Sequence, residues 1–285
     1  MTPDEKLNNL KEYYYSIKDC SQCGLAASRT KFVFGSGNSN AKIMFVGEAP
    51  GKNEDLQGKP FVGQAGRLLD ELLDSIGYKR AEVFIANVLK CRPPQNRDPD
   101  QEEIHLCAKY LFEQIKIIDP LIVCTLGKYS TQLLLDTNEG ITGLRGRVFK
   151  IGSRYILPIN HPAAALYAPS RFGILKNDFS RIEKVMAVIK TGKSDDLISI
   201  EICSNSAIEE KSMEAKEKSF EKEKDLKTEK NHISGNLETA VDSNTNNKNV
   251  SDNLINPSDI NINKNINAKT VKENNFQSEQ MGLFE

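Results

Sequence analysis

Four cysteines are the residues whose types and spacing most directly indicate chemistry in this chain. Cys20 and Cys23 form a Cys-x-x-Cys pair, and Cys91 and Cys107 stand alone far downstream. A close pair and two distant cysteines cannot come from one local hairpin, so the chain must fold back to bring them together. Four thiolates gathered in a cysteine-poor chain predict a metal centre, either an iron–sulfur cluster or a zinc ion.

Glycines and prolines follow the first apolar run of the chain. This run ends in Gly47-Glu48-Ala49-Pro50-Gly51, and a second glycine-rich stretch, residues 58–66, contains Phe61. At this density, glycine and proline let main-chain amides approach a ligand closely. The glycine spacing does not match a dinucleotide-binding or triphosphate-binding loop. The alternative is a tight loop whose glycines only cap helices.

Two later apolar runs end in side chains that suit nucleic-acid recognition. Asn87 ends one run, and its amide offers the donors and the acceptor that can read a base edge. Arg92 and Arg97 follow on a proline-stiffened loop and could contact phosphates. His161 ends another run beside Pro162. The alternative is that Asn87 caps a turn, the arginines face solvent and the histidine is structural.

Alternating apolar and helical segments must position these side chains. Strands are predicted at residues 42–47, 83–88, 121–126 and 155–160, and helices at 3–18, 65–76, 100–118, 127–135 and 171–189. The first three strands are almost continuously apolar, as expected of strands covered on both faces. The alternation predicts an α/β fold, a three-layer α/β/α sandwich around a central four-stranded parallel sheet. Such sheets bind ligands beyond the carboxyl ends of their strands.

Composition limits the class of protein. The chain has 285 residues, of which 39% are apolar and 27% charged, enough for one core in residues 1–193. Its polar start is unlike a signal peptide, and no apolar run approaches the length of a membrane span. We therefore expect a cytoplasmic protein without a membrane partner, in which six cysteines favour metal ligation over disulfides.

The C-terminal part has a different character. The net charge of −1 conceals a mildly basic first part and an acidic tail. Residues 194–279 are rich in Asn, Lys, Glu and Ser, cannot bury enough apolar surface, and are predicted to be a disordered linker. The last residues, 280–285, restore apolar side chains.

Taken together, the motifs resemble those of the family 4 uracil-DNA glycosylases, the iron–sulfur branch of the uracil-DNA glycosylase superfamily. The resemblance covers residues from about 5 to 190 and includes, in the family's order, Gly47-Glu48-Ala49-Pro50-Gly51, Gly58-Lys59-Pro60-Phe61-Val62-Gly63, Asn87, Cys91-Arg92-Pro93-Pro94 and His161-Pro162. It implies a [4Fe-4S] cluster with a structural role, held by Cys20, Cys23, Cys91 and Cys107. Zinc remains the alternative from spacing alone.

The resemblance also implies a mechanism in which uracil is flipped out of DNA into a pocket. Phe61 would stack on the base, Asn87 would read its O4 and N3–H edge, and His161 would donate to its O2 as charge develops. Gly47, Glu48 and Ala49 would line the same substrate-binding site. Leu166 or a neighbour would wedge into the base stack, and Arg92, Arg97 and Arg171 would contact the DNA.

The residue that activates water is left open. Family 1 enzymes have a catalytic Asp where this chain has Ala49, so Glu48 and Glu54 are the available carboxylates. No lysine stands out as a Schiff-base nucleophile, which predicts a monofunctional glycosylase that does not cleave the strand. The catalytic domain is expected to be a monomer that acts on uracil-containing DNA.

Two alternatives and one further partner accompany this reading. The chain could be a non-enzymatic iron–sulfur DNA-binding or polymerase-accessory module, or a related glycosylase for other deaminated bases such as hypoxanthine. The C-terminal Gln280-Met281-Gly282-Leu283-Phe284 resembles the bacterial sliding-clamp-binding peptide, whose apolar side chains fill pockets on the clamp. The linker before it would act as a tether.

Overall fold

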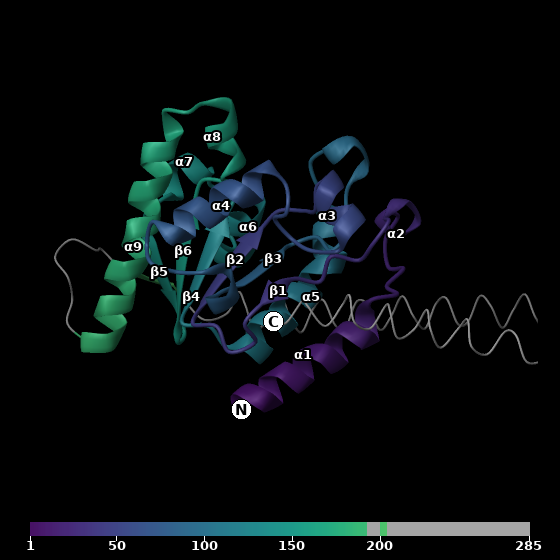
Figure 1. Cartoon of the computed structure of the whole chain (residues 1–285), viewed down its shortest axis with the longest axis horizontal. Helices are drawn as coiled ribbons and strands as arrows, with labels where there is room; N and C mark the ends of the chain where they lie inside the picture. The colour runs from purple at the N-terminus through teal and green to yellow at the C-terminus, as the bar shows by residue number, and fades with distance from the viewer. Residues whose placement is uncertain (193–199, 204–285) are drawn as a thin grey trace, which may run out of the picture. The chain divides into compact units, whose positions relative to one another are not determined.

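A mixed sheet forms the centre of the computed structural model, which describes residues 1–192 and 200–203 (Figure 1). Within these residues the sheet has seven strands in the order β1-β3-β2-β4-β6-β5-β7. The strands are β1 (Ser36–Gly37), β2 (Ile43–Gly47), β3 (Phe84–Asn87), β4 (Ile122–Leu126), β5 (Val148–Ile151), β6 (Arg154–Ile159) and β7 (Ile200–Cys203). The helices are α1 (Pro3–Ile17), α2 (Leu25–Ser28), α3 (Lys52–Gln57), α4 (Gln64–Asp74), α5 (Gln101–Ile118), α6 (Lys128–Leu135), α7 (Ile141–Leu144), α8 (Ala163–Tyr167) and α9 (Arg171–Thr191).

The four strands expected from the sequence form the parallel centre of the sheet. β2 pairs in parallel with β3 and β4, and β4 pairs in parallel with β6. The prediction of a four-stranded, wholly parallel sheet is nevertheless wrong. β1 pairs antiparallel with β3, β5 pairs antiparallel with β6, and β7 extends the β5 edge in parallel. β1 has only two residues, too few to leave a recognisable pattern, and β5 reverses direction into β6 through the tight turn at Gly152.

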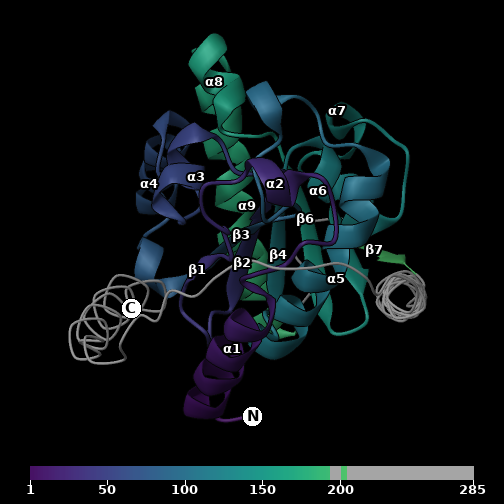
Figure 2. The same ribbon diagram turned by 90° about the vertical axis from the view of Figure 1, so that its right-hand side faces the viewer.

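Alternate residues of β2 face two separate groups of buried side chains. Met44 and Val46 pack with apolar residues of α1 and α5. Ile43 and Phe45 pack with those of α4 and α9. A strand whose successive side chains point to opposite faces needs apolar cover on both, which explains its continuously apolar sequence. Figure 2 shows α1, α5 and α9 around the strands. The three-layer sandwich stays a prediction. The packing of alternate β2 side chains into two separate clusters supports it.

The long helices begin and end close to where their sequences indicate. The expected helices appear as α1, α4, α5, α6 and α9. α1 begins with a capping box between Thr2 and Glu5, and α5 with one between Asp100 and Glu103. α5 ends at Ile118, and the capping residue Asp119 takes a left-handed conformation before Pro120. These boundaries matter for function because α1 leads into Cys20 and α5 carries Cys107.

The described residues beyond position 193 belong to the sheet. β7 lies inside the segment 194–279 that the sequence suggests as a linker, and Arg147 donates from Nε to Glu201 of this strand over 2.7 Å. The remainder of that segment and the peptide 280–285 lie outside the described residues. No helix in the described part of the chain is both long enough and apolar enough to span a membrane.

Candidate active site and cysteine centre

The carboxyl ends of β2 and β3 bring Gly47 and Asn87 side by side. The two residues are partners in the parallel register of these strands. Asn87 is only 2% exposed, and its Oδ1 has no hydrogen-bond partner among the described residues. A buried polar atom without a partner costs about 1–3 kcal/mol. Such an atom at the ligand-binding end of a parallel sheet indicates that a ligand supplies the missing donor.

Phe61 closes this corner of the site. Its main chain has a φ of 53°, in the left-handed region that residues other than glycine rarely adopt. Its ring is stacked on His161 with a centroid distance of 5.5 Å and an interplanar angle of 27°. A Cβ at position 47 would lie 2.4 Å from Asn87 Oδ1 and 2.7 Å from Phe61 Cζ. Only glycine at position 47 lets the amide and the ring approach each other this closely.

Glu54 holds the loop that carries Phe61. Its Oε1 accepts hydrogen bonds from the main-chain N–H groups of Val62 and Gly63, each at 2.9 Å. Gly66 lets α4 approach the same loop, because a Cβ there would lie 1.8 Å from the Phe61 carbonyl oxygen. The strained conformation of Phe61 is therefore maintained from both sides.

Glu48 is the carboxylate whose acidity the site changes most. Partial burial is the main cause that raises its pKa to about 7, repulsion from Asp98 adds to this, and attraction to Lys128 opposes it. A carboxyl group with a pKa near neutrality can accept a proton at physiological pH and release it again. The Glu48 side chain therefore has the acidity that suits a general base. Its main chain is fixed separately, because its carbonyl oxygen accepts from the Leu89 N–H at 3.0 Å.

His161 is held as a neutral imidazole. Burial lowers its pKa to about 4, against a smaller opposing effect of Glu54. The main-chain N–H of Ala163 donates to Nδ1 at 3.2 Å. In a neutral ring one nitrogen accepts and the other carries the proton, so this contact assigns the proton to Nε2. The free donor of His161 is therefore Nε2–H.

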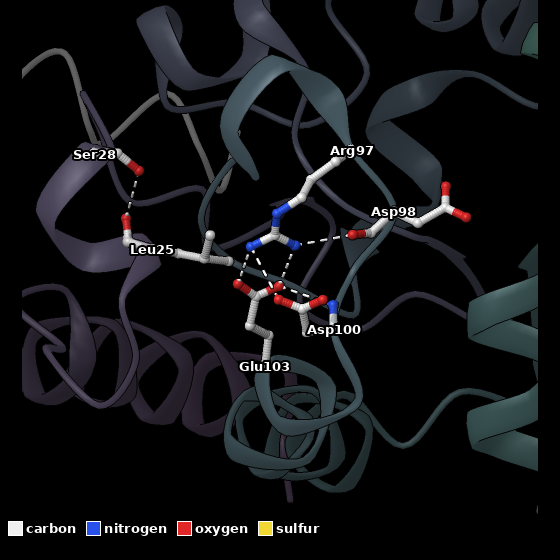
Figure 3. Close-up of polar contacts among 6 residues, drawn as sticks. All are labelled: Leu25, Ser28, Arg97, Asp98, Asp100 and Glu103. Carbon is white, nitrogen blue, oxygen red and sulfur yellow. Dashed lines mark hydrogen bonds and ion pairs between the residues drawn. The ribbon is translucent and has the colours of Figure 1, made fainter.

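The two arginines of the loop after Cys91 have protein partners. Arg97 donates to both carboxylate oxygens of Glu103, at 2.9 and 2.6 Å, and forms an ion pair with Asp100 (Figure 3). Arg92 donates from Nε to Asn96 Oδ1 at 2.8 Å. Arg97 thus ties the loop to the first turn of α5. A role of either arginine in contacting DNA stays a prediction.

The segment after His161 exposes apolar side chains. Leu166 is 42% exposed and its neighbour Tyr167 is 89% exposed, both at the end of α8. Arg171 follows as the exposed first residue of α9. The sequence-based choice of Leu166 as the wedge is compatible with this exposure. Tyr167 is the more exposed of the two, and only its position beside Leu166 could have suggested it.

The four cysteines line one pocket. Cys20 and Cys23 come from the segment between α1 and α2, Cys91 from the loop after β3, and Cys107 from α5, and all four surround the same pocket. These four cysteines and Cys124 are free of disulfide bonds. Within residues 1–192 and 200–203, no three His, Cys, Asp or Glu side chains are grouped closely enough to hold a metal ion.

Hydrogen-bond donors point at these sulfur atoms. Tyr110 Oη donates to Cys20 Sγ at 3.0 Å, Arg29 contacts Cys91 Sγ at 3.5 Å, and the Lys90 main-chain N–H donates to Cys107 Sγ at 3.3 Å. Burial raises the pKa of Cys107 to about 12, so its thiolate needs compensating positive charge or metal. Donors of this kind are the outer partners that thiolate-bound centres use. The residue types around the pocket therefore fit a thiolate-held cofactor.

Three residues of this surrounding shell were missed from the sequence. Arg29 and Tyr110 reach cysteines 62 and 90 positions away, and no local spacing signals such contacts. Lys90 is fully buried although it is a lysine. Its place in the otherwise apolar run before Cys91 was a signal that could have identified it.

Comparison with known proteins identifies the family of the chain. The model of the uracil DNA glycosylase superfamily matches residues 34–186. A type-4 uracil-DNA glycosylase of Sulfurisphaera tokodaii is 45% identical over 188 residues, which are 63% of this chain and 86% of the relative. The type-4 uracil-DNA glycosylase of Archaeoglobus fulgidus is 42% identical over 184 residues, 62% of this chain and 92% of the relative.

A buried amide, an aromatic ring and an imidazole meet at one edge of a sheet with a parallel centre, and the chain belongs to the uracil-DNA glycosylase superfamily. Within that superfamily it belongs to the type-4 uracil-DNA glycosylases.

Proposed function

We propose that this chain releases uracil from DNA by hydrolysing its N-glycosidic bond, as a monofunctional glycosylase of base excision repair. The observation that carries the proposal is the buried, unpartnered Oδ1 of Asn87 beside the Phe61 ring. The names of the relatives, type-4 uracil-DNA glycosylases, support the same substrate. A base inside a duplex is out of reach, so the nucleotide has to be flipped into the site.

Base selection follows from the orientation of the Asn87 amide. Oδ1 accepts the N3–H of uracil, and the amide nitrogen donates to O4. Cytosine presents an unprotonated N3 and an amino group at these positions, so the same amide meets two mismatches of roughly 1–3 kcal/mol each. Phe61 stacks on the flipped base, and Gly47 leaves room for both side chains.

Bond cleavage separates charge between the sugar and the base. The C1′–N1 bond breaks, its electron pair moves to the uracil ring, and a water molecule attacks C1′. His161 donates from Nε2 to O2, where negative charge grows, and its neutral state suits this role. Glu48 accepts the proton lost by the water. Glu54 is left to hold the Phe61 loop, since its Oε1 already accepts two main-chain N–H groups.

Strand cleavage by a Schiff base is not part of this mechanism. The lysine nearest to Asn87 in the sequence is Lys90, which is fully buried and donates from Nζ to two internal acceptors. An amine in this position cannot reach C1′ of a flipped nucleotide. The abasic product should therefore remain uncut until base or heat is applied.

A change of Asn87 to Asp tests the proposed recognition. The carboxylate keeps an acceptor for N3–H and loses the donor for O4, so uracil release should fall roughly tenfold to a hundredfold, the equivalent of ~1–3 kcal/mol. Release of cytosine should become detectable, because its amino group can donate to the carboxylate. The measurement is base release from oligonucleotides that contain uracil, cytosine, hypoxanthine or thymine, in single and double strands.

Asn177→Asp is the matched control, since this exposed asparagine lies on α9. It should behave as the wild type. Unchanged selectivity of Asn87→Asp would remove Asn87 from base recognition. Absence of base release by the wild-type protein would favour the non-enzymatic DNA-binding alternative, and preferential hypoxanthine release would favour the broader glycosylase.

The pH profile tests the role of Glu48. Its raised pKa means that the carboxylate, the form that accepts a proton, is populated only as the pH rises through about 7. Wild-type activity should increase up to that pH and then level off. Glu48→Gln should remove this rise. It should also lower the rate on the plateau by about tenfold to a hundredfold, up to the ~10² lower end of general base catalysis. Glu54→Gln keeps an acceptor oxygen and should retain the rise. A rise that persists in Glu48→Gln would assign it to another group.

We also propose that Cys20, Cys23, Cys91 and Cys107 hold a [4Fe-4S] cluster. The common pocket and the donors aimed at the sulfur atoms support this, as does the type-4 family. A single zinc ion requires four sulfurs within about 2.3 Å of one point. A [4Fe-4S] cluster instead distributes its four thiolates over several irons. When bound, the cluster supplies structural cross-links between α1, α5 and the loop after β3.

The remaining assignments are proposals too. Leu166 acts as the wedge, and Arg92, Arg97 and Arg171 contact the DNA of a monomeric catalytic domain in residues 1–193. Unpaired cysteines support a cytoplasmic location. The linker 194–279 and the sliding-clamp peptide 280–285 rest on sequence alone, and a clamp pull-down before and after deletion of 280–285 addresses the latter.

A further inference from the structure

Lys90 is a fully buried lysine at the junction of the base-reading strand and the cysteine centre. Its side chain has 0% exposure, and Nζ donates to the main-chain oxygen of Asn87 at 2.8 Å and to Gln114 Oε1 at 2.7 Å. Gln114 is equally buried and donates to the Phe34 oxygen at 2.9 Å. These bonds join the end of β3 to α5 and to the segment before β1.

The main chain of Lys90 contacts the cysteine centre at the same time. Its N–H donates to Cys107 Sγ at 3.3 Å, its carbonyl oxygen accepts from Val33 at 2.8 Å, and Cys91 is the next residue. The hydrogen-bond acceptors of Nζ are both neutral oxygens, the Asn87 carbonyl and the Gln114 amide, so the buried side chain is fixed at the end of β3.

We propose that Lys90 is a positioning residue that couples the four-cysteine centre to uracil recognition. Its main-chain N–H contacts Cys107 on one side, and its side chain fixes the main chain of Asn87 on the other. The Asn87 amide is thereby held in the orientation that reads the base. This inference rests on the proposed function and adds to it a route by which a structural centre affects base selection.

A double-mutant cycle separates positioning from a general loss of stability. The variants are Lys90→Met, Asn87→Ala and the double replacement, with kcat/KM measured on a uracil oligonucleotide. Lys90→Met should lower kcat/KM about tenfold in the wild-type background and less than about twofold in the Asn87→Ala background, because coupled residues are non-additive. Lys90→Arg should restore part of the loss. Lys184→Met, on the exposed face of α9, is the control and should match the wild type.

Two further measurements keep the inference testable. The N–H groups of Val88 and Leu89 donate to the oxygens of Gly47 and Glu48, each at 3.0 Å. Their hydrogen exchange should be faster in Lys90→Met, and affinity for uracil-free DNA should stay unchanged. If Lys90→Met does not fold, Gln114→Leu, which removes the other anchor of Nζ, should show the same pattern with a loss of about threefold.

The outcomes distinguish this inference from the function on which it rests. Equal losses in both backgrounds, or exchange rates at Val88 and Leu89 equal to the wild type, would overturn the positioning role while leaving glycosylase activity intact. If the wild-type protein releases no uracil, the proposed function fails, and the exchange measurement alone still decides whether Lys90 fixes the end of β3.

Discussion

Replacing His161 by leucine is expected to lower the rate of uracil release by about 10²–10³-fold, the loss that follows removal of one donor to a developing oxyanion. The donor is Nε2–H, because Ala163 uses Nδ1 as an acceptor. Burial lowers the pKa of His161 to about 4, so the donating species is the neutral ring at neutral pH. The measurement is the single-turnover rate on a single-stranded uracil oligonucleotide.

His105→Leu is the matched control, since His105 is exposed on α5. It should leave the rate unchanged. Affinity of His161→Leu for DNA that contains an abasic site should also stay near the wild-type value, because the interaction strengthens in the transition state. A rate within about threefold of the wild type would show that another group stabilises the leaving uracil.

The same histidine should leave a signature in stability. Its folded-state pKa lies below the unfolded value of about 6.5, so the folded protein binds fewer protons there. The contribution of neutral His161 to the free energy of unfolding is fully present above pH 6.5 and is lost as the pH falls toward 4. In His161→Leu, the fall in Tm over this interval should be smaller than in the wild type.

Replacing Cys91 by alanine is expected to give colourless protein of greatly reduced stability. The free energy of metal binding at a structural site is also free energy of folding, ~10–16 kcal/mol for zinc. If the variant loses about a third of such a contribution, its free energy of unfolding falls by ~4 kcal/mol. A domain of this size loses roughly 2–4 °C in Tm per kcal/mol, so Tm should fall by about 8–16 °C. Visible absorbance, iron content per chain and thermal unfolding measure the effect.

Cys124→Ala is the control for removal of a buried sulfur. Cys124 is fully buried in β4, belongs to the apolar cluster around Ile43 and Phe45, and does not line the cysteine pocket. This variant should keep its iron and lose no more than about 1–2 kcal/mol, as for a small cavity. If Cys91→Ala stays folded with full iron content, the cluster ligands are assigned incorrectly.

Much of the site could be predicted because its parts lie at strand ends. The runs that end at Gly47 and Asn87 are apolar enough to be recognised as central strands, and their carboxyl ends must meet if both strands are parallel. The cysteine spacing likewise required a return of the chain that α1 and α5 provide. β1, β5 and β7 escaped because strands of two to four residues leave a weak pattern.

The sequence by itself therefore determined the parallel centre of the sheet, the residues at its strand ends and the cysteines that converge. Tertiary structure alone decided how those residues are used. Arg97 is bound to Glu103, Glu54 holds the Phe61 loop, and Lys90 joins Asn87 to the cysteine centre. Periodicity is a local property that one segment carries, whereas each of these contacts depends on where a second, distant segment places its donor or acceptor.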